Sequence, residues 1–241
     1  MVPILELSLR QLAGRWRLLI IFFLASLPVV ITVLVRVLGG DDESAQDDFV
    51  QGMLGGMIVA AIMPIVAMTL ATAAFGNELE DRTLSYLLLK PVRRIFVALP
   101  KLLATVIVAG PLMAASSVAV VSVALGVEAQ TAVAVGLAVF LGVVAYSAVF
   151  TWAGLIPSHA LGFALVYVFL WEGIISGFLS GVRYLSIRAY TLSIMFGMDE
   201  TGMSALEESV IEFPAAIVGA ALVTAGFLWL TVRRLRTMDV P

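Results

Sequence analysis

Residues 102–155 read LLATVIVAGPLMAASSVAVVSVALGVEAQTAVAVGLAVFLGVVAYSAVFTWAGL, and this stretch decides the class of fold. Its only charged residue, Glu128, separates two long apolar runs. A helix needs roughly 20 apolar residues, each adding ~1.5 Å, to cross ~30 Å of hydrocarbon. Inside lipid a single segment satisfies its own backbone only as a helix. We therefore predict two transmembrane helices, at 102–127 and 131–155.

The composition of the whole chain agrees with this interpretation. Hydrophobic residues make up 61% of the 241 residues and charged residues 13%, against about 45–50% and about 25% in soluble domains. So much apolar surface cannot all be buried in one core, and part of it must face lipid. The absence of cysteine and the single histidine exclude disulfides, thiolate metal sites and multi-histidine metal sites. Nothing in the charge distribution indicates a nucleic-acid partner.

Four further apolar runs complete the predicted membrane domain. They extend the pattern on both sides of the opening stretch, and none carries enough charge to be excluded from the bilayer. We expect one all-α transmembrane domain over 1–241 with six spans, at 18–38, 53–75, 102–127, 131–155, 160–181 and 213–232.

The basic residues predict the orientation of these spans. With the N-terminus in the cytoplasm, Arg36, Arg183 and Arg188 fall on the outer side and the other eleven of the 14 Lys and Arg residues fall inside. Such a bias is typical of cytoplasmic loops. Both termini are therefore predicted to be cytoplasmic.

Two segments outside the spans have helical patterns of their own. In 2–17, Leu5, Leu9 and Leu12 recur at helical spacing beside arginines, which predicts a helix lying in the cytoplasmic interface. The alternative is a charged leader that only sets topology. The outer segment 182–212 begins too apolar for a plain loop, and we expect a short helix there that dips back into the outer leaflet.

The largest cytoplasmic loop, 76–100, contains the sequence ELEDRTLSYLLLKPVRR at 78–94. Acidic residues open it and basic residues close it, and Glu78 and Arg82 are spaced for an i,i+4 pair. Three leucines share one helical face, which predicts a short amphipathic helix suited to a groove of another protein. A solvated connector lying on the membrane is the alternative. The leucines are Leu84, Leu87 and Leu88.

This loop resembles the signature of the ABC-2 type permeases, the membrane subunits of a class of ATP-driven exporters. That signature has an acidic pair, Thr-Leu, a short leucine-rich helix, a proline with a nearby arginine, and a lysine that opens the third span. Arg82 departs from the pattern, since glycine is frequent there. The topology of the whole chain is also similar to the family's. The matching positions are Glu78, Glu80, Thr83, Leu84, Leu87, Leu88, Pro91, Arg94 and Lys101.

The resemblance implies that the loop is a coupling helix that sits in a cleft of a separate ATP-binding subunit. It further implies two such ATPase copies and two permease protomers, for which we expect a homodimer, in a bacterial or archaeal cytoplasmic membrane. The first, second and fifth spans would tend to face the central cavity. The residues expected to contact the ATPase are Glu78, Glu80, Asp81, Arg82, Thr83, Leu84, Leu87, Leu88, Pro91 and Arg94.

The chain itself carries no phosphate-binding loop of the form Gly-x-x-x-x-Gly-Lys-Ser/Thr, because neither Lys90 nor Lys101 precedes Ser or Thr. We therefore predict that it is no enzyme by itself. No cofactor or metal is expected on this chain, and ATP and magnesium are expected on the partner ATPase.

Glu172 lies within the fifth predicted span, where an acidic group is costly unless it faces water or a partner. One hypothesis makes it a cavity-lining group that touches the substrate or gates the outer exit. The other pairs it with Arg183 or Arg188, tying the outer segment to the span. The two hypotheses remain open at the level of sequence.

Gly173, Gly177 and Gly181 repeat every four residues in the same span. Small residues at this spacing let helices approach closely. They predict a contact face, either between protomers or within one protomer.

Three other functional classes compete with the exporter subunit. A stand-alone secondary transporter would use Glu172 as its ion or proton relay. A membrane-embedded enzyme would need a nucleophile or metal constellation, which the spans do not offer. A scaffold without transport activity is the third. The substrate is not indicated by any motif.

Overall fold

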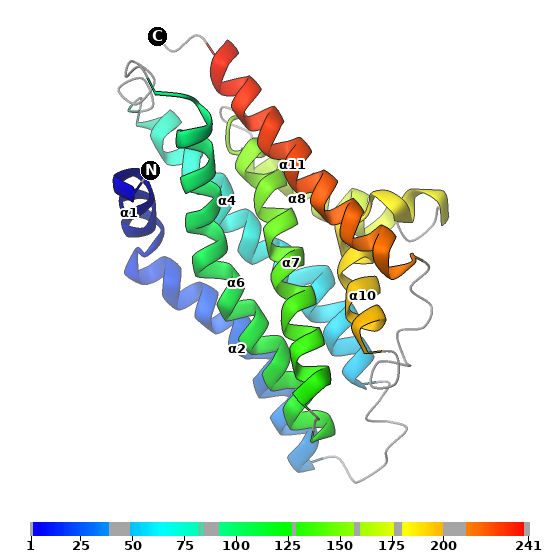
Figure 1. The fold of residues 1–241 in the computed structure, drawn as a ribbon. Coiled ribbons are helices and arrows are strands. Elements are labelled where there is room, and N and C mark those ends of the chain that lie inside the picture. Colours follow the sequence, from blue (N-terminus) through cyan, green and yellow to red (C-terminus); the bar gives the residue numbers. More distant parts are fainter. Residues whose placement is uncertain are drawn as a thin grey trace.

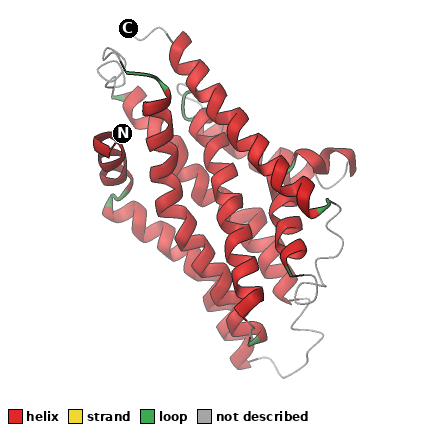
Figure 2. Ribbon diagram, viewed as in Figure 1, coloured by secondary structure: helices red, strands yellow, loops and turns green. Residues whose placement is uncertain are grey.

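The computed structural model describes residues 2–38, 49–81, 83, 92–126, 129–156, 160–175, 180–199 and 211–238. Throughout these ranges the regular structure is helical and no strand is present (Figure 2). The helices run up and down in one elongated bundle, with both chain ends at the same end of it (Figure 1). The predicted all-α class is confirmed.

Within the described residues, five helices are long and apolar enough to cross a membrane. The second of them, Phe49–Leu79, runs through a π-helical part, η1, before it becomes α4. They coincide with the first, second, third, fourth and sixth predicted spans, and most of them extend beyond the predicted bounds. Their bounds are α2 (Arg15–Leu38), η1 (Gly52–Ile62) with α4 (Met63–Glu80), α6 (Ile95–Leu125), α7 (Ala129–Ala153) and α11 (Phe213–Thr237).

The fifth predicted span is not one continuous α-helix. A short α-helix, α8 (Ala160–Val166), changes into the π-helix η2 (Tyr167–Ile175), and a 3₁₀ helix, η3 (Ser180–Leu185), follows. The apolar helix Ala160–Ile174 is shorter than a membrane-crossing helix. The wider π turn coincides with Glu172, whose side chain reaches a neighbouring segment described below. The predicted span at 160–181 is therefore not confirmed by the described residues, 160–175 and 180–181.

The centre of the bundle is formed by α4 and α7. In their most apolar windows 72% and 67% of residues are buried, against 22% in both α2 and α11. Helix α7 packs against α6, α4, α11 and α10, while α2 lies along α6 (Figure 1). A displacement of α4 must therefore move its neighbours, whereas α2 and α11 have free outer faces.

Both segments predicted to be helical outside the spans are helices. Helix α1 (Val2–Leu12) ends before Gly14 and packs against α6, with Leu12 buried. It is shorter than the predicted 2–17, because residues from Arg15 onward already belong to α2. In the outer segment, α10 (Ile187–Met198) packs against α7 and α11.

A small apolar cluster joins the helix ends at the end of the bundle where both termini lie. It brings together one or two side chains each from α4, α6 and α11, and one from the turn after α7. This cluster sets the positions at which α4 ends and α6 begins. Its buried members are Phe75, Val97, Ala98, Leu155, Val232 and Leu235.

Glycines of α7 and of the turn that follows it are among the sites of close helix packing. A Cβ built on Gly154 would lie 2.7 Å from the carbonyl oxygen of Thr72 in α4. A Cβ on Gly142 would overlap Thr191 of α10 and Met63 of α4. Only glycine lets α4 pack this closely against α7.

Candidate functional site

The predicted ATPase-contact segment begins where α4 ends and finishes where α6 begins. Of this segment the structure describes Glu78, Leu79, Asp81, Thr83 and 92–94, together with the backbone of Glu80. The predicted amphipathic helix and the predicted Glu78–Arg82 pair lie outside the described residues. So do the positions Arg82, Leu84, Leu87, Leu88 and Pro91.

The described ends of the segment are fixed by hydrogen bonds to the two helices. The Thr83 amide donates to the carbonyl oxygen of Glu78 at 2.9 Å, and its hydroxyl donates to the same oxygen at 3.5 Å. At the other end, the Ala98 amide donates to the carbonyl oxygen of Arg94 at 3.0 Å, which starts α6. Asp81 and Thr83 are exposed and Arg94 is half-buried.

Glu78 and Lys101 form an ion pair between α4 and α6. The Lys101 Nζ donates to Glu78 Oε1 at 2.7 Å and also to the carbonyl oxygen of Ala74. It lies 4.8 Å from the centre of the Phe75 ring. Lys101 is fully buried and Glu78 is 4% exposed. The ion pair thus joins α4 to α6 inside the protein, at the point where the 78–94 segment leaves α4 and returns to α6.

This placement changes the interpretation of two residues. Glu78 was predicted to face an ATPase, yet its carboxylate is turned into the bundle. Lys101 was matched to the family signature without a role, and the structure gives it a buried acidic partner. The position of Lys101 in an apolar helix could have predicted an acidic partner, because a buried charge needs an opposite charge. The sequence did not show which acidic residue would supply it.

Glu172 is buried, with 2% of its surface exposed, and joins η2 to the start of α10. The Ser186 hydroxyl donates to its Oε2 at 2.5 Å, and the Ile187 amide donates to its Oε1 at 2.9 Å. The Tyr167 hydroxyl donates to Oε1 at 3.3 Å. The carboxylate thus connects η2 to the start of α10, where the Arg188 backbone also hydrogen-bonds to it. Neither hypothesis for Glu172 is decided by these contacts.

The contact makes Glu172 part of the N-terminal cap of α10. Ser186 is the N-cap residue, and its hydroxyl oxygen accepts the Ala189 amide at 3.1 Å. The first amides of a helix have no partners within the helix, and negative charge is favoured at that end. A carboxylate from another segment therefore satisfies α10 and fixes its position against η2.

The predicted glycine stripe does not form on one helix. Gly173 lies in η2 and is exposed, whereas Gly181 belongs to η3. Gly177 lies outside the described residues. Near Gly173 a Cβ would meet only the Val168 carbonyl oxygen of its own helix, at 3.6 Å. Among the described glycines, Gly110, Gly142 and Gly154 are closely packed, whereas Gly173 is not.

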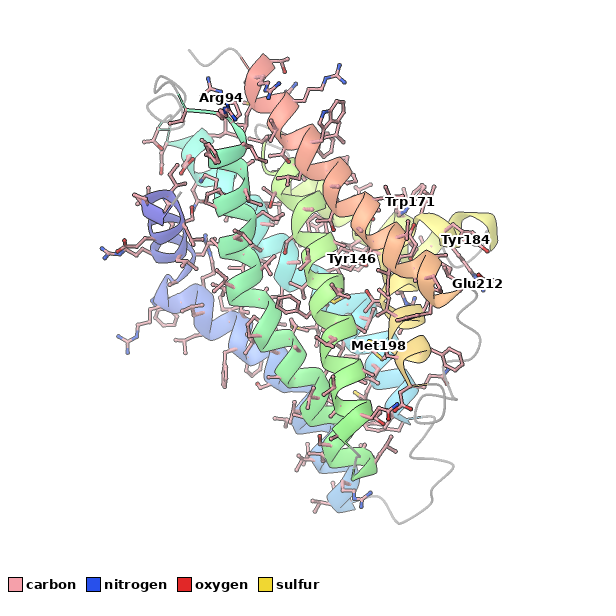
Figure 3. The ribbon with its side chains drawn as sticks, in the orientation of Figure 1. Arg94, Tyr146, Trp171, Tyr184, Met198 and Glu212 are labelled. Carbon is pink, nitrogen blue, oxygen red and sulfur yellow. The ribbon has the colours of Figure 1, made fainter. Side chains whose placement is uncertain are left out.

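Segments η2 and η3 extend sideways from the bundle. Figure 3 shows Trp171 and Tyr184 at this side, away from Tyr146 in the middle of α7. The Trp171 indole donates to the Leu185 carbonyl oxygen at 3.4 Å, and the Phe150 ring of α7 meets Tyr167 edge to face at 5.9 Å. These contacts connect the extension to the core.

Among the described residues, no group of three or more His, Cys, Asp or Glu side chains could hold a metal ion. The long apolar helices of the described fold place the chain in the class of multi-pass membrane proteins. The family model described as ABC-2 family transporter protein matches residues 14–179, so the chain belongs to the ABC-2 transporter family. It is thus a membrane subunit of a transporter. A comparison with curated protein sequences gives no match.

Proposed function

We propose that this chain forms the translocation pathway of an ABC exporter as a homodimer, driven by two copies of a separate ATPase that dock on the 78–94 segment. The family match carries this proposal. The sequence of the segment supports it, because its acidic start, leucine face and Pro-Arg end fit the family's coupling helix. ATP and magnesium belong to the partner, and the membrane is the bacterial or archaeal cytoplasmic membrane.

The packing around the segment is suited to transmitting motion. Helix α4 is largely buried between α6 and α7, and Asp81 and Thr83, which follow its last turn, are exposed. A partner that pushes on this surface displaces a central helix of the bundle. ATP-driven approach of two ATPases would then reorient the spans of both protomers.

The free apolar faces support the dimer. Helix α2 exposes Phe22 and Phe23, and η2 exposes Phe169, each by more than half of its surface. Lipid covers such faces in a lone protomer, and a second protomer can cover part of them. The family resemblance implies that the first, second and fifth spans face the cavity. The first and fifth have free faces, whereas the second is largely buried within its own protomer.

The secondary-transporter alternative is not favoured. A relay group must bind and release an ion or proton on an accessible oxygen. Both Glu172 oxygens already accept hydrogen bonds from Ser186 and Ile187 within the same protomer. A role of Glu172 as pathway or gate residue in the exporter stays a prediction, which the stability experiment in the Discussion addresses.

The test is co-expression with the ABC ATPase that this proposal predicts in a neighbouring reading frame, followed by affinity capture from detergent. We expect the wild-type chain to retain the ATPase, and the variants Glu80→Lys and Arg82→Glu to lose it. Glu212→Lys, at an exposed outer position, is the matched control and should retain it. Equal capture and equal ATP turnover by all four proteins would refute docking on this segment.

A further inference from the structure

The Lys101 ammonium is held by one turn of α4. Its contacts are the Ala74 carbonyl oxygen, the Phe75 ring and the Glu78 carboxylate. Lys101 thus contacts a backbone oxygen, an aromatic ring and a carboxylate, all from the same turn of α4. A lysine bound on three sides in this way fixes α6 against α4 in both height and rotation.

The same turn of α4 also fixes the departing chain. The Glu78 side chain binds Lys101 while its carbonyl oxygen accepts two hydrogen bonds from Thr83. One residue thus connects the end of α4, the first part of the cytoplasmic segment and the second turn of α6. Helix ends otherwise fray, because their last backbone groups lack partners.

Apolar packing alone would hold the two helices together with less precision. The cluster around Phe75, Val97 and Ala98 is non-directional, since hydrophobic contact depends on area and not on angle. A buried charge pair depends steeply on geometry, and removing its charges tends to spare stability when apolar groups of similar volume replace them. The pair is therefore better explained by orientation than by stability.

We infer that Glu78 and Lys101 are positioning residues, which clamp the end of α4 to the start of α6 so that the 82–94 segment moves both helices as one body. This assigns Glu78 a place inside the transmission and not on the ATPase contact surface. Transmission of force rests on the proposed function, whereas the clamped geometry of the two helix ends does not.

The test uses the full-length chain in detergent micelles. The double variant Glu78→Leu/Lys101→Met keeps the side-chain volume and removes both charges, so no buried charge is left alone. Glu6→Leu/Arg10→Met is the matched control, because it removes an exposed ion pair of α1 with a 2.6 Å contact. Hydrogen exchange is followed in peptides covering 77–81 and 95–98, and thermal melting reports folding.

We expect the Glu78→Leu/Lys101→Met chain to melt close to wild type while both peptides exchange at least ~10-fold faster, as local opening becomes easier. The control should exchange as wild type does. In complex with the ATPase, the same variant should keep ATPase binding and lose most of the ATP turnover that the wild-type chain stimulates.

Unchanged exchange at 77–81 and 95–98 in the folded double variant would overturn the clamp. Faster exchange with full stimulated turnover would overturn its part in transmission. A wild-type chain that never binds the ATPase, together with faster exchange in the variant, would refute the proposed function and leave the clamp standing.

Discussion

Replacing Glu172 should loosen the outer half of the bundle. Glu172→Ala removes the acceptor of the Ser186 hydroxyl and of the Ile187 amide, which both lie in residues that are 1% exposed. An orphaned buried donor costs about 1–3 kcal/mol, so the two together cost roughly 4 kcal/mol. For a chain of this length each kcal/mol lowers the melting temperature by about 2–4 °C. We expect a fall on the order of 10 °C.

The variant Glu172→Gln removes the negative charge and keeps the shape of the side chain. The amide oxygen can still accept from Ile187, but the bonds are no longer charge-assisted, which costs about 1 kcal/mol and lowers the melting temperature by about 2–4 °C. Thermal melting in detergent and hydrogen exchange of 187–190 measure both effects. Glu212→Ala is the control, because its side chain makes no cap hydrogen bond at α11 and is exposed.

The structural interpretation fails if Glu172→Ala melts within 2 °C of wild type, on the order of measurement error, or if exchange at 187–190 is unchanged. Loss of transport in Glu172→Gln with stability and exchange intact would instead support the pathway hypothesis. Reduced assembly with normal activity per complex would exclude it.

Two further substitutions test the packing of the long helices by the same melting assay. Gly154→Ala should destabilise the protein by about 1–3 kcal/mol, because the added Cβ would lie 2.7 Å from a backbone oxygen of α4. The control Gly226→Ala, where nothing lies within 4 Å of the added Cβ, should stabilise α11 by up to ~1 kcal/mol. Equal changes in melting temperature for the two variants would contradict this account. Ser116→Ala should cost about 1 kcal/mol, because its hydroxyl donates across helices to the Ala25 carbonyl oxygen at 2.5 Å. Ser26→Ala, whose hydroxyl bonds only within its own helix at an exposed site, should be neutral, and the reverse order would refute the cross-helix role.

Length and composition were sufficient to predict the helices that cross the bundle. A run of apolar residues must be a helix in lipid, whatever it packs against, so 102–127 and 131–155 were predictable without tertiary information. The same criterion is not confirmed at 160–181. The apolar character continues there, but the backbone changes from α to π near Glu172, whose partners lie in the next segment.

Pairing across helices was the part that sequence spacing could not supply. The i,i+4 rule compares residues on one helix, so it favoured Arg82 as the partner of Glu78. The structure pairs Glu78 with Lys101, which becomes a neighbour only when α6 packs beside α4. The same holds for Gly142 and Gly154, which look no different in sequence from Gly173. Their importance comes from what lies opposite them.

The lengths of the helices give the surrounding lipid an influence on the cytoplasmic segment. Helix α6 has 31 residues and α2 has 24, or about 46 Å and 36 Å at ~1.5 Å per residue, against a hydrocarbon thickness of ~30 Å. A helix longer than the bilayer tilts, and it tilts more as the bilayer thins. Since Lys101 fastens α6 to α4, both helices tilt together. We therefore expect acyl-chain length to change the tilt of α4 and α6 together, and with it the position of their joined ends relative to the membrane surface.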